Sequence, residues 1–166
     1  MVPGCAVALV SAAAHASHDP AGWAGACGKT QLAAHAARSL RRAGAADVVA
    51  WVTGSSRMSV LDGYAQAAAM VGLGQAGDAG LSAARFAAWL ASTRQPWLVV
   101  LDDLRNRADL DGLWPAGPAG RVLITTREPA AVESEPVRVL PTGTFSPREA
   151  VGYLSGRLTQ DPGVSE

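Results

Sequence analysis

The sequence predicts an α/β fold in which helices cover both faces of a parallel sheet. Short runs rich in Val, Leu and Ile recur along the chain, and most lack the strict polar–apolar alternation of a half-exposed strand. Stretches with helical spacing of apolar residues separate these runs. Strands that alternate with helices form parallel sheets through right-handed crossovers. We therefore expect a three-layer α/β/α sandwich with a five-stranded parallel sheet.

Individual elements follow from the local patterns. The strands are expected over residues 5–12, 47–53, 97–102, 121–126 and 137–140, and the helices over residues 29–43, 59–73, 81–93 and 147–158. In the first helix Leu32, Ala36 and Leu40 recur at four-residue spacing, which predicts its buried face. Before the last helix, Ser146 and Glu149 have the spacing of a capping box.

Composition and charge exclude several classes of protein. The 166 residues are enough for about one domain, and 49% hydrophobic with 17% charged residues is typical of a folded chain. Fourteen basic and fourteen acidic side chains cancel, which gives no support for direct binding of nucleic acid or membrane by this segment. Cys5 and Cys27 are too few for a disulfide framework or a thiolate zinc cluster. The first apolar run has no basic region before it and is too short to span a bilayer, so a cytoplasmic location is expected.

A glycine-rich stretch, GWAGACGKTQLA at residues 22–33, is close to the phosphate-binding pattern G-x-x-x-x-G-K-[ST]. Gly28, Lys29 and Thr30 match the end of the pattern, whereas Trp23 stands where its first glycine belongs. In such loops backbone N–H groups ring the phosphates, the lysine reaches the β and γ oxygens, and the hydroxyl holds Mg²⁺. The expected nucleotide contacts are Gly25, Ala26, Cys27, Gly28, Lys29, Thr30 and Gln31.

Lys29 is the only lysine of the chain, beside thirteen arginines. A compact ammonium and a planar guanidinium are not interchangeable at a phosphate, so a single lysine in this place supports the assignment. The N–H groups from Ala26 to Thr30 are retained in the second half of the loop, where most phosphate donors lie. We expect a weakened but functional site, with Trp23 affecting its entrance.

Two acids follow the buried run LVVL at residues 98–101. An apolar strand that ends in acids is the Walker B arrangement, in which Asp102 would hold Mg²⁺ and Asp103 would orient or deprotonate the attacking water. The alternative is that one of these acids caps the helix-like segment LRNRADLDGL that comes next.

A third segment, GRVLITTR at residues 120–127, is a buried strand that ends in hydroxyls and Arg127. Ligands of open α/β sheets bind at the carboxyl ends of the strands, so Arg127 could pair with the γ-phosphate there. Alone, an arginine in this position is usually a solvated charge. The three segments occur in an order that is consistent with one nucleotide-binding fold.

The run from GACGKTQLA through VVAWVTG and WLVVLDDL to GRVLITTR resembles the NB-ARC nucleotide-binding domain of the STAND class of P-loop NTPases, over about residues 20–158. The resemblance implies a signalling or transcriptional regulator whose domain switches between ADP and ATP with Mg²⁺ and is at most a slow ATPase. It gives Lys29 and Thr30 the Walker A roles, Asp102 and Asp103 the Walker B roles, and Arg127 the sensor role. The expected partners are the nucleotide and other domains or copies of a larger STAND regulator.

The same resemblance implies a domain division. Residues 1–140 would form the nucleotide-binding domain, residues 141–158 the start of a helical subdomain, and residues 159–166 a tail. NB-ARC loops usually read G-x-G-G-x-G-K-T, and here Trp23 and Ala26 replace two of the glycines. Two alternatives remain from the residues themselves: a small-molecule P-loop kinase, and a degenerate fragment that no longer binds nucleotide.

Overall fold

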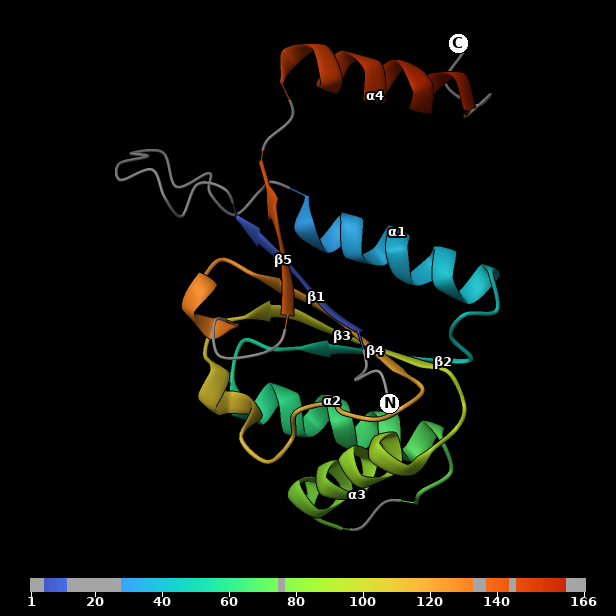
Figure 1. Ribbon diagram of the computed structural model, residues 1–166, viewed down its shortest axis with the longest axis vertical. Helices are drawn as coiled ribbons and strands as arrows, with labels where there is room; N and C mark the ends of the chain where they lie inside the picture. The colour runs from blue at the N-terminus through green and yellow to red at the C-terminus, as the bar shows by residue number, and fades with distance from the viewer. Residues whose placement is uncertain (1–4, 12–27, 75–76, 133–136, 144–145, 161–166) are drawn as a thin grey trace.

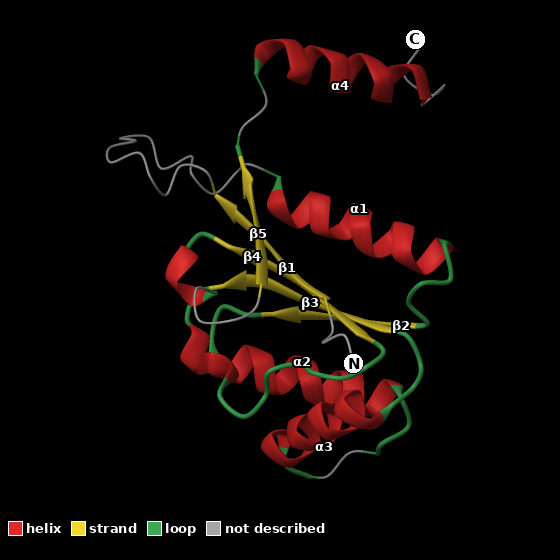
Figure 2. Cartoon of the chain, viewed as in Figure 1, coloured by secondary structure: helices red, strands yellow, loops and turns green. Residues whose placement is uncertain are grey.

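The structure, a computed structural model, describes residues 5–11, 28–74, 77–132, 137–143 and 146–160. Five strands are joined in one sheet in the order β2-β3-β4-β1-β5, and the pairings are parallel (Figure 2). The strands are β1 (Cys5–Ser11), β2 (Val48–Thr53), β3 (Trp97–Leu104), β4 (Gly120–Thr126) and β5 (Val137–Thr142). The helices are α1 (Lys29–Arg42), α2 (Arg57–Met70), α3 (Ala79–Ser92) and α4 (Pro147–Gln160), with short 3-10 helices η3 (Arg107–Leu110) and η4 (Pro129–Ala131). The predicted α/β fold with a parallel sheet is confirmed.

Helices lie on both faces of the sheet (Figure 1), with α1 on one face and α2 and α3 on the other. Successive side chains of β3 alternate between two apolar clusters. Leu98 and Val100 belong to the cluster under α1, whereas Val99 and Leu101 belong to the cluster under α2 and α3. All four are at most 1% exposed. Burial on both faces explains why this run is continuously apolar.

The sheet order places β4 between β1 and β3. The chain therefore leaves β1, crosses the sheet through α1 and returns at the far edge in β2. As a result the first turn of α1 lies close to the carboxyl ends of β3 and β4, which are joined to it by side-chain contacts described below.

The buried face of α1 differs from the predicted one. Its buried residues are Lys29, Ala33 and Ala37, which lie four residues apart along one stripe. Leu32, expected to be buried, is 48% exposed, while the other two residues of the predicted face are only partly buried. Alanines let the helix approach the sheet closely, and the larger side chains are displaced to the flanks of the contact.

N-terminal caps account for where the other helices begin. α2 starts two residues before the predicted position, because the side chain of Ser56 accepts a hydrogen bond from the Ser59 N–H at 3.2 Å. α3 also starts two residues early, and there the Asp78 carboxylate accepts from the N–H groups of Gly80 and Leu81. Side-chain capping at these ends satisfies donors that the helix itself leaves without partners.

The predicted capping box of α4 is confirmed. The Glu149 N–H donates to the Ser146 hydroxyl oxygen at 3.3 Å, and the Glu149 carboxylate accepts from the Ser146 N–H at 2.9 Å and from its hydroxyl at 2.7 Å. The two hydrogen bonds that the Glu149 carboxylate accepts, from the Ser146 hydroxyl and from the Ser146 N–H, stabilise its charged form. They hold the pKa of Glu149 below its ordinary value. The helix runs two residues past its predicted end, to Gln160.

The tryptophans divide between core and surface. Trp97 is 1% exposed and lies in the core, whereas Trp51 is 41% exposed. Trp51 lies in the edge strand β2 on the face that α1 covers, and α1 packs mainly over β3 and β4 rather than over that edge. The sequence pattern of β2 does not reveal how far the covering helix reaches.

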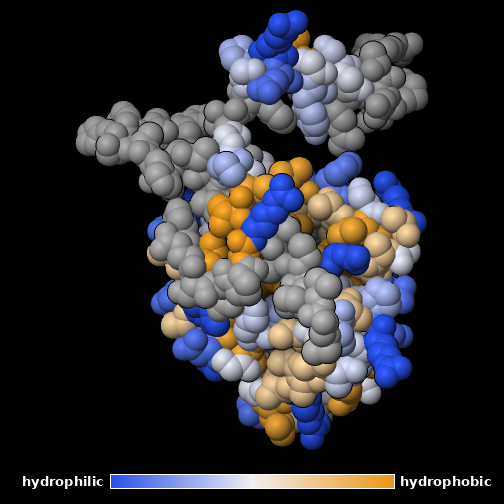
Figure 3. Space-filling view, in the orientation of Figure 1, coloured by the Kyte–Doolittle hydropathy of each residue, from blue (hydrophilic) through white to orange (hydrophobic). Residues whose placement is uncertain are grey.

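The opposite edge of the sheet is partly apolar. Among the described strands β5 pairs only with β1, and its residues Val139 and Leu140 are 47% and 37% exposed. Figure 3 shows apolar side chains gathered on the face where β5 runs. Beyond this edge α4 lies apart from the sheet, on the same side as α1 (Figure 1). No helix in the described part of the chain combines the length and the apolar character needed to cross a bilayer.

Candidate functional site

Polar side chains from three elements meet at the carboxyl edge of the sheet. They come from the first turn of α1, the end of β3 and the end of β4. This is the edge at which open α/β sheets bind ligands. Of the predicted contacts, Gly25, Ala26 and Cys27 lie outside the described residues, and so does Trp23.

The N-terminus of α1 is formed without a side-chain cap. Gly28 is the N-cap, with φ 73° and ψ 13°, and it makes no side-chain cap hydrogen bond. This left-handed conformation favours glycine, which explains why the motif has a glycine at this position. The positive end of the helix dipole and the first backbone N–H groups are therefore directed at the edge of the sheet without a competing side-chain acceptor from the cap.

Lys29 and Thr30 occupy the first two positions of α1, followed by Gln31. Lys29 is 6% exposed, whereas Thr30 and Gln31 are exposed. A lysine is almost never this buried in a surface helix unless its ammonium has polar partners. The burial places the ammonium end of the chain's single lysine within the protein rather than in bulk solvent.

A hydroxyl–carboxylate network links α1 to the two strands. The Thr30 hydroxyl donates to Asp102 Oδ1 at 2.9 Å, across 72 positions of sequence. The Thr125 hydroxyl, at the end of β4, donates to the same Oδ1 at 2.5 Å. Asp102 continues the face of β3 that carries Leu98 and Val100, so regular strand alternation directs it toward α1. The predicted metal-binding pair, Thr30 and Asp102, is thus brought together.

The end of β3 contains a β-bulge at Asp103. The register with β4 shifts between Leu101 and Leu104, and Asp103 has φ 57°, the one positive φ of a non-glycine residue among the described residues. Strand alternation would send Asp103 to the core beside Leu101, but the bulge gives that place to Leu104, which is fully buried. The bulge turns the Asp103 carboxylate out to the edge of the sheet. Its own N–H donates to the Thr125 hydroxyl oxygen at 2.8 Å.

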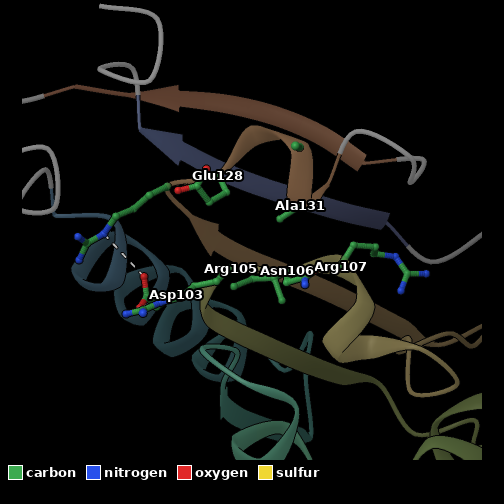
Figure 4. Close-up of a pocket in the computed structure, with 9 residues that line it drawn as sticks. Asp103, Arg105, Asn106, Arg107, Glu128 and Ala131 are labelled. Carbon is green, nitrogen blue, oxygen red and sulfur yellow. Dashed lines mark hydrogen bonds and ion pairs between the residues drawn. The ribbon is translucent and has the colours of Figure 1, made fainter. Parts of the chain in front are cut away.

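Asp103 contacts two arginines. Its Oδ2 accepts from Arg105 Nε at 3.2 Å and Nη2 at 3.0 Å, and its Oδ1 lies 3.7 Å from Arg127 Nε. Figure 4 shows the Asp103 side chain at the end of a row formed by Arg105 and Asn106, with a dashed ion pair running to it. These residues line a cavity of about 610 Å³ whose wall also includes Leu104, Arg107, Glu128, Ala130 and Ala131. Arg127 therefore lies at the predicted edge, paired with an acid rather than only solvated.

The alternative in which a β3 acid caps the next helix is wrong. The segment after β3 contains only the 3-10 helix η3, and its N-cap is Asn106, whose side chain accepts from the Ala108 N–H at 3.0 Å. Asp102 and Asp103 both lie within β3, before this segment begins. Their side chains are thus available to the edge of the sheet instead of to a helix terminus.

The residues at this edge fit a magnesium ion. Mg²⁺ prefers oxygen ligands, keeps several of its waters and takes one or two protein groups, and it is commonly shared with the phosphates of a nucleotide. Thr30 Oγ1 and Asp102 Oδ1 are a hydroxyl and a carboxylate oxygen 2.9 Å apart. Thr125 donates to the same oxygen from the end of β4, as outer partners of metal ligands do.

Two residues of this site were not predicted individually. Thr125 connects Asp102 to the Asp103 N–H, and Arg105 makes the shortest ion pair of Asp103. The signal for Thr125 was present in the pair of threonines that ends β4, where a β-branched polar residue follows three buried apolar ones. No comparable signal marks Arg105, because its partner is set by the bulge.

Thr125 is expected to be important for both stability and metal-dependent binding. Replacing it with valine keeps the shape but removes the acceptor of the Asp103 N–H and the donor to Asp102, at a cost of about 1–3 kcal/mol in the free energy of unfolding. Urea denaturation measures this loss. The control is Thr125→Ser, which retains the hydroxyl and should unfold close to wild type. Equal stability of the valine and serine variants would contradict the role of the hydroxyl.

No protein-family model and no curated protein matches this sequence. Among solved structures, the chain resembles two of the ORC2 protein of Aeropyrum pernix, one of its ADPNP–ADP complexes and one of its ADP form. The first has a TM-score of 0.65 at 17% identity and covers 98% of this chain, and the second has 0.63 at 16% and covers 99%. This chain spans about half the length of each, 49% in both cases. The likeness shows that this chain shares the α/β fold of those structures, and it does not single out the NB-ARC type.

Proposed function

We propose that this chain is an ATP- and ADP-binding domain of the P-loop type, which acts as a nucleotide switch and hydrolyses ATP slowly at most. The observation that carries the proposal is the 2.9 Å hydrogen bond between Thr30 and Asp102. It joins the two motifs that such a site requires, from segments 72 residues apart. A chance G-K-T sequence would have no reason to lie against an acid at the end of a buried strand.

In this proposal each polar residue has one task. The uncapped N–H groups at the start of α1 and the Lys29 ammonium bind the phosphates. Thr30 and Asp102 hold Mg²⁺, which when bound neutralises charge on the β- and γ-phosphate oxygens. Asp103 accepts a hydrogen bond from the attacking water, and Arg127 pairs with the γ-phosphate.

The choice of nucleotide is supported by the structural neighbours. Both solved ORC2 structures are complexes with adenine nucleotides, ADPNP and ADP in one and ADP in the other. The sequence resemblance to NB-ARC domains favours a switch in a larger STAND-type regulator, with β5 and α4 leading toward a helical subdomain. Under that interpretation residues 1–140 are the nucleotide-binding part, residues 141–158 begin the helical subdomain, and other domains or copies of the regulator are the partners.

Isothermal titration calorimetry with ADP and ATP, each with and without Mg²⁺, tests the proposal. We expect one nucleotide to bind per chain and the affinity for ATP to depend on Mg²⁺. Absence of heat and of any thermal stabilisation with both nucleotides would leave the degenerate-fragment alternative as the correct one. Turnover with added small-molecule acceptors, but not without them, would favour the kinase alternative.

The two acids of β3 are expected to differ in their effects. Asp102→Ala should weaken Mg²⁺-dependent ATP binding about tenfold, because it removes the carboxylate that contacts Thr30. Asp103→Ala should leave ADP affinity unchanged and remove hydrolysis, since Asp103 has no contact with Thr30 in the described network and faces the cavity instead. Calorimetry and phosphate release measured on both variants check the division. Equal loss of affinity in the two variants would contradict it.

A further inference from the structure

Both carboxylate oxygens of Asp103 face guanidinium groups. Arg105 contacts Oδ2 through two nitrogens, at 3.2 and 3.0 Å, and Arg127 approaches Oδ1 at 3.7 Å. An acid that is to accept a hydrogen bond from water needs a free lone pair directed at that water. The contacts of Asp103 instead orient both oxygens toward guanidinium groups.

Arg105 and Arg127 hold this acid from different elements. Arg105 directly follows the end of β3 and is two residues from Asp103 in the sequence. Its contact with Asp103 therefore depends on the bulge, where Asp103 has φ 57°. Arg127 comes from the end of β4, and its contact at 3.7 Å is longer than those of Arg105. A γ-phosphate carries more negative charge than one carboxylate and competes for Arg127 better than Asp103 does. Arg105 makes two hydrogen bonds to Oδ2, at 3.2 and 3.0 Å, and therefore holds Asp103 more firmly than Arg127 does.

We propose that Arg105 is a restraining residue that keeps Asp103 from the attacking water and thereby slows hydrolysis. The proposal rests on the proposed function, since it concerns the same acid. In the reaction the water oxygen bonds to the γ-phosphorus as the bond from that phosphorus to the β–γ bridging oxygen breaks. A proton of the water passes to the Asp103 carboxylate, and ADP and phosphate are released. Arg105 fixes the orientation of the carboxylate through its two bonds to Oδ2, so Asp103 has to break these bonds to turn toward the water. A domain that must hold ATP as a signal gains lifetime from this restraint.

The expected change in kcat follows from the solvent exposure of the Arg105–Asp103 ion pair. The Arg105 and Asp103 side chains are 64% and 32% exposed, so their attraction is screened by solvent, although the two nitrogens on one oxygen give it better geometry than a single contact. We expect release of Asp103 to raise kcat about threefold, which is the order of an exposed ion pair. The affinity for ADP is not expected to change, because Arg105 does not touch the Thr30–Asp102 network.

Single-turnover and steady-state ATP hydrolysis test the restraint with four proteins. Arg105→Gln should raise kcat about threefold with an unchanged Kd for ADP. Arg105→Lys, which keeps the charge, should stay close to wild type. Arg85→Gln is the matched control: it removes the same charge from an exposed position of α3 and should leave kcat unchanged. At about 1 M NaCl, where the Debye length is about 3 Å, the difference between wild type and Arg105→Gln should shrink.

A second readout needs no turnover. In the NMR spectrum of the nucleotide-free protein, the Nε–Hε signal that disappears in Arg105→Gln belongs to Arg105. Asp103→Ala should shift this signal, because it removes the acceptor of that N–H. A signal that does not move in Asp103→Ala would overturn the contact.

The outcomes separate the restraint from the proposed function. ADP binding by all four proteins together with a kcat of Arg105→Gln at or below that of wild type would overturn the restraint and leave the nucleotide site standing. Failure of the wild type to bind ADP or ATP in calorimetry would overturn both.

Discussion

Replacing Lys29 with alanine is expected to weaken ADP and ATP binding about 100-fold, the equivalent of ~2.7 kcal/mol. Lys29 is 6% exposed at the first position of a helix whose N-terminus has no side-chain cap, so in the proposed function its ammonium would act on a bound phosphate from a poorly hydrated position. Charge-assisted hydrogen bonds to phosphate are the stronger kind, and they gain from exclusion of water. Isothermal titration calorimetry with ADP and Mg²⁺ measures the loss.

Lys29→Arg is the matched variant for this experiment. It keeps the positive charge but replaces a compact ammonium by a larger planar group, which fits a tight phosphate loop less well. We expect its affinity to lie between those of wild type and alanine. Thermal unfolding of all three proteins without nucleotide shows whether each is folded. If wild type and Lys29→Ala bound ADP with the same Kd, the phosphate-binding role of Lys29 would be wrong.

Much of the fold could be predicted because the apolar pattern is unambiguous where burial is two-sided. The continuous run of β3 is buried on both faces, and a continuous run is what a central parallel strand requires. The Ser146–Glu149 pair predicted the start of α4 from local chemistry alone. In contrast, the exposure of Leu32 and Trp51 depends on where α1 rests on the sheet, and no local pattern contains that information.

The site was predictable only as far as strand ends determine it. Thr30 and Asp102 meet because a helix follows one strand and an acid ends another, and parallel topology brings such ends to one edge. The bulge could not be read from the sequence, because aspartate adopts a left-handed conformation only where neighbouring contacts compensate for it. The pairing of Asp103 with Arg105 and the linking role of Thr125 both depend on that bulge.

A glycine outside the site leaves space for the ring of a buried tryptophan. Gly120 begins β4 directly opposite Trp97 of β3. The indole lies over Gly120, and a Cβ added there would overlap the six-membered ring of Trp97. On its other side the indole N–H donates to the Leu90 carbonyl of α3 at 3.1 Å. The ring is therefore enclosed between a strand backbone and a helix backbone, with little space to shift.

Gly120→Ala is expected to lower the free energy of unfolding by about 4 kcal/mol, because overpacking adds to the loss of a buried hydrogen bond. That is a large part of the marginal stability of a domain of this size and corresponds to a fall in Tm of about 8–16 °C. Thermal and urea unfolding followed by the fluorescence of the tryptophans measure it. Gly152→Ala is the control, since nothing lies within 4 Å of the added Cβ in α4 and alanine favours a helix. A Gly120→Ala protein as stable as the control would mean that Trp97 is not held between β4 and α3.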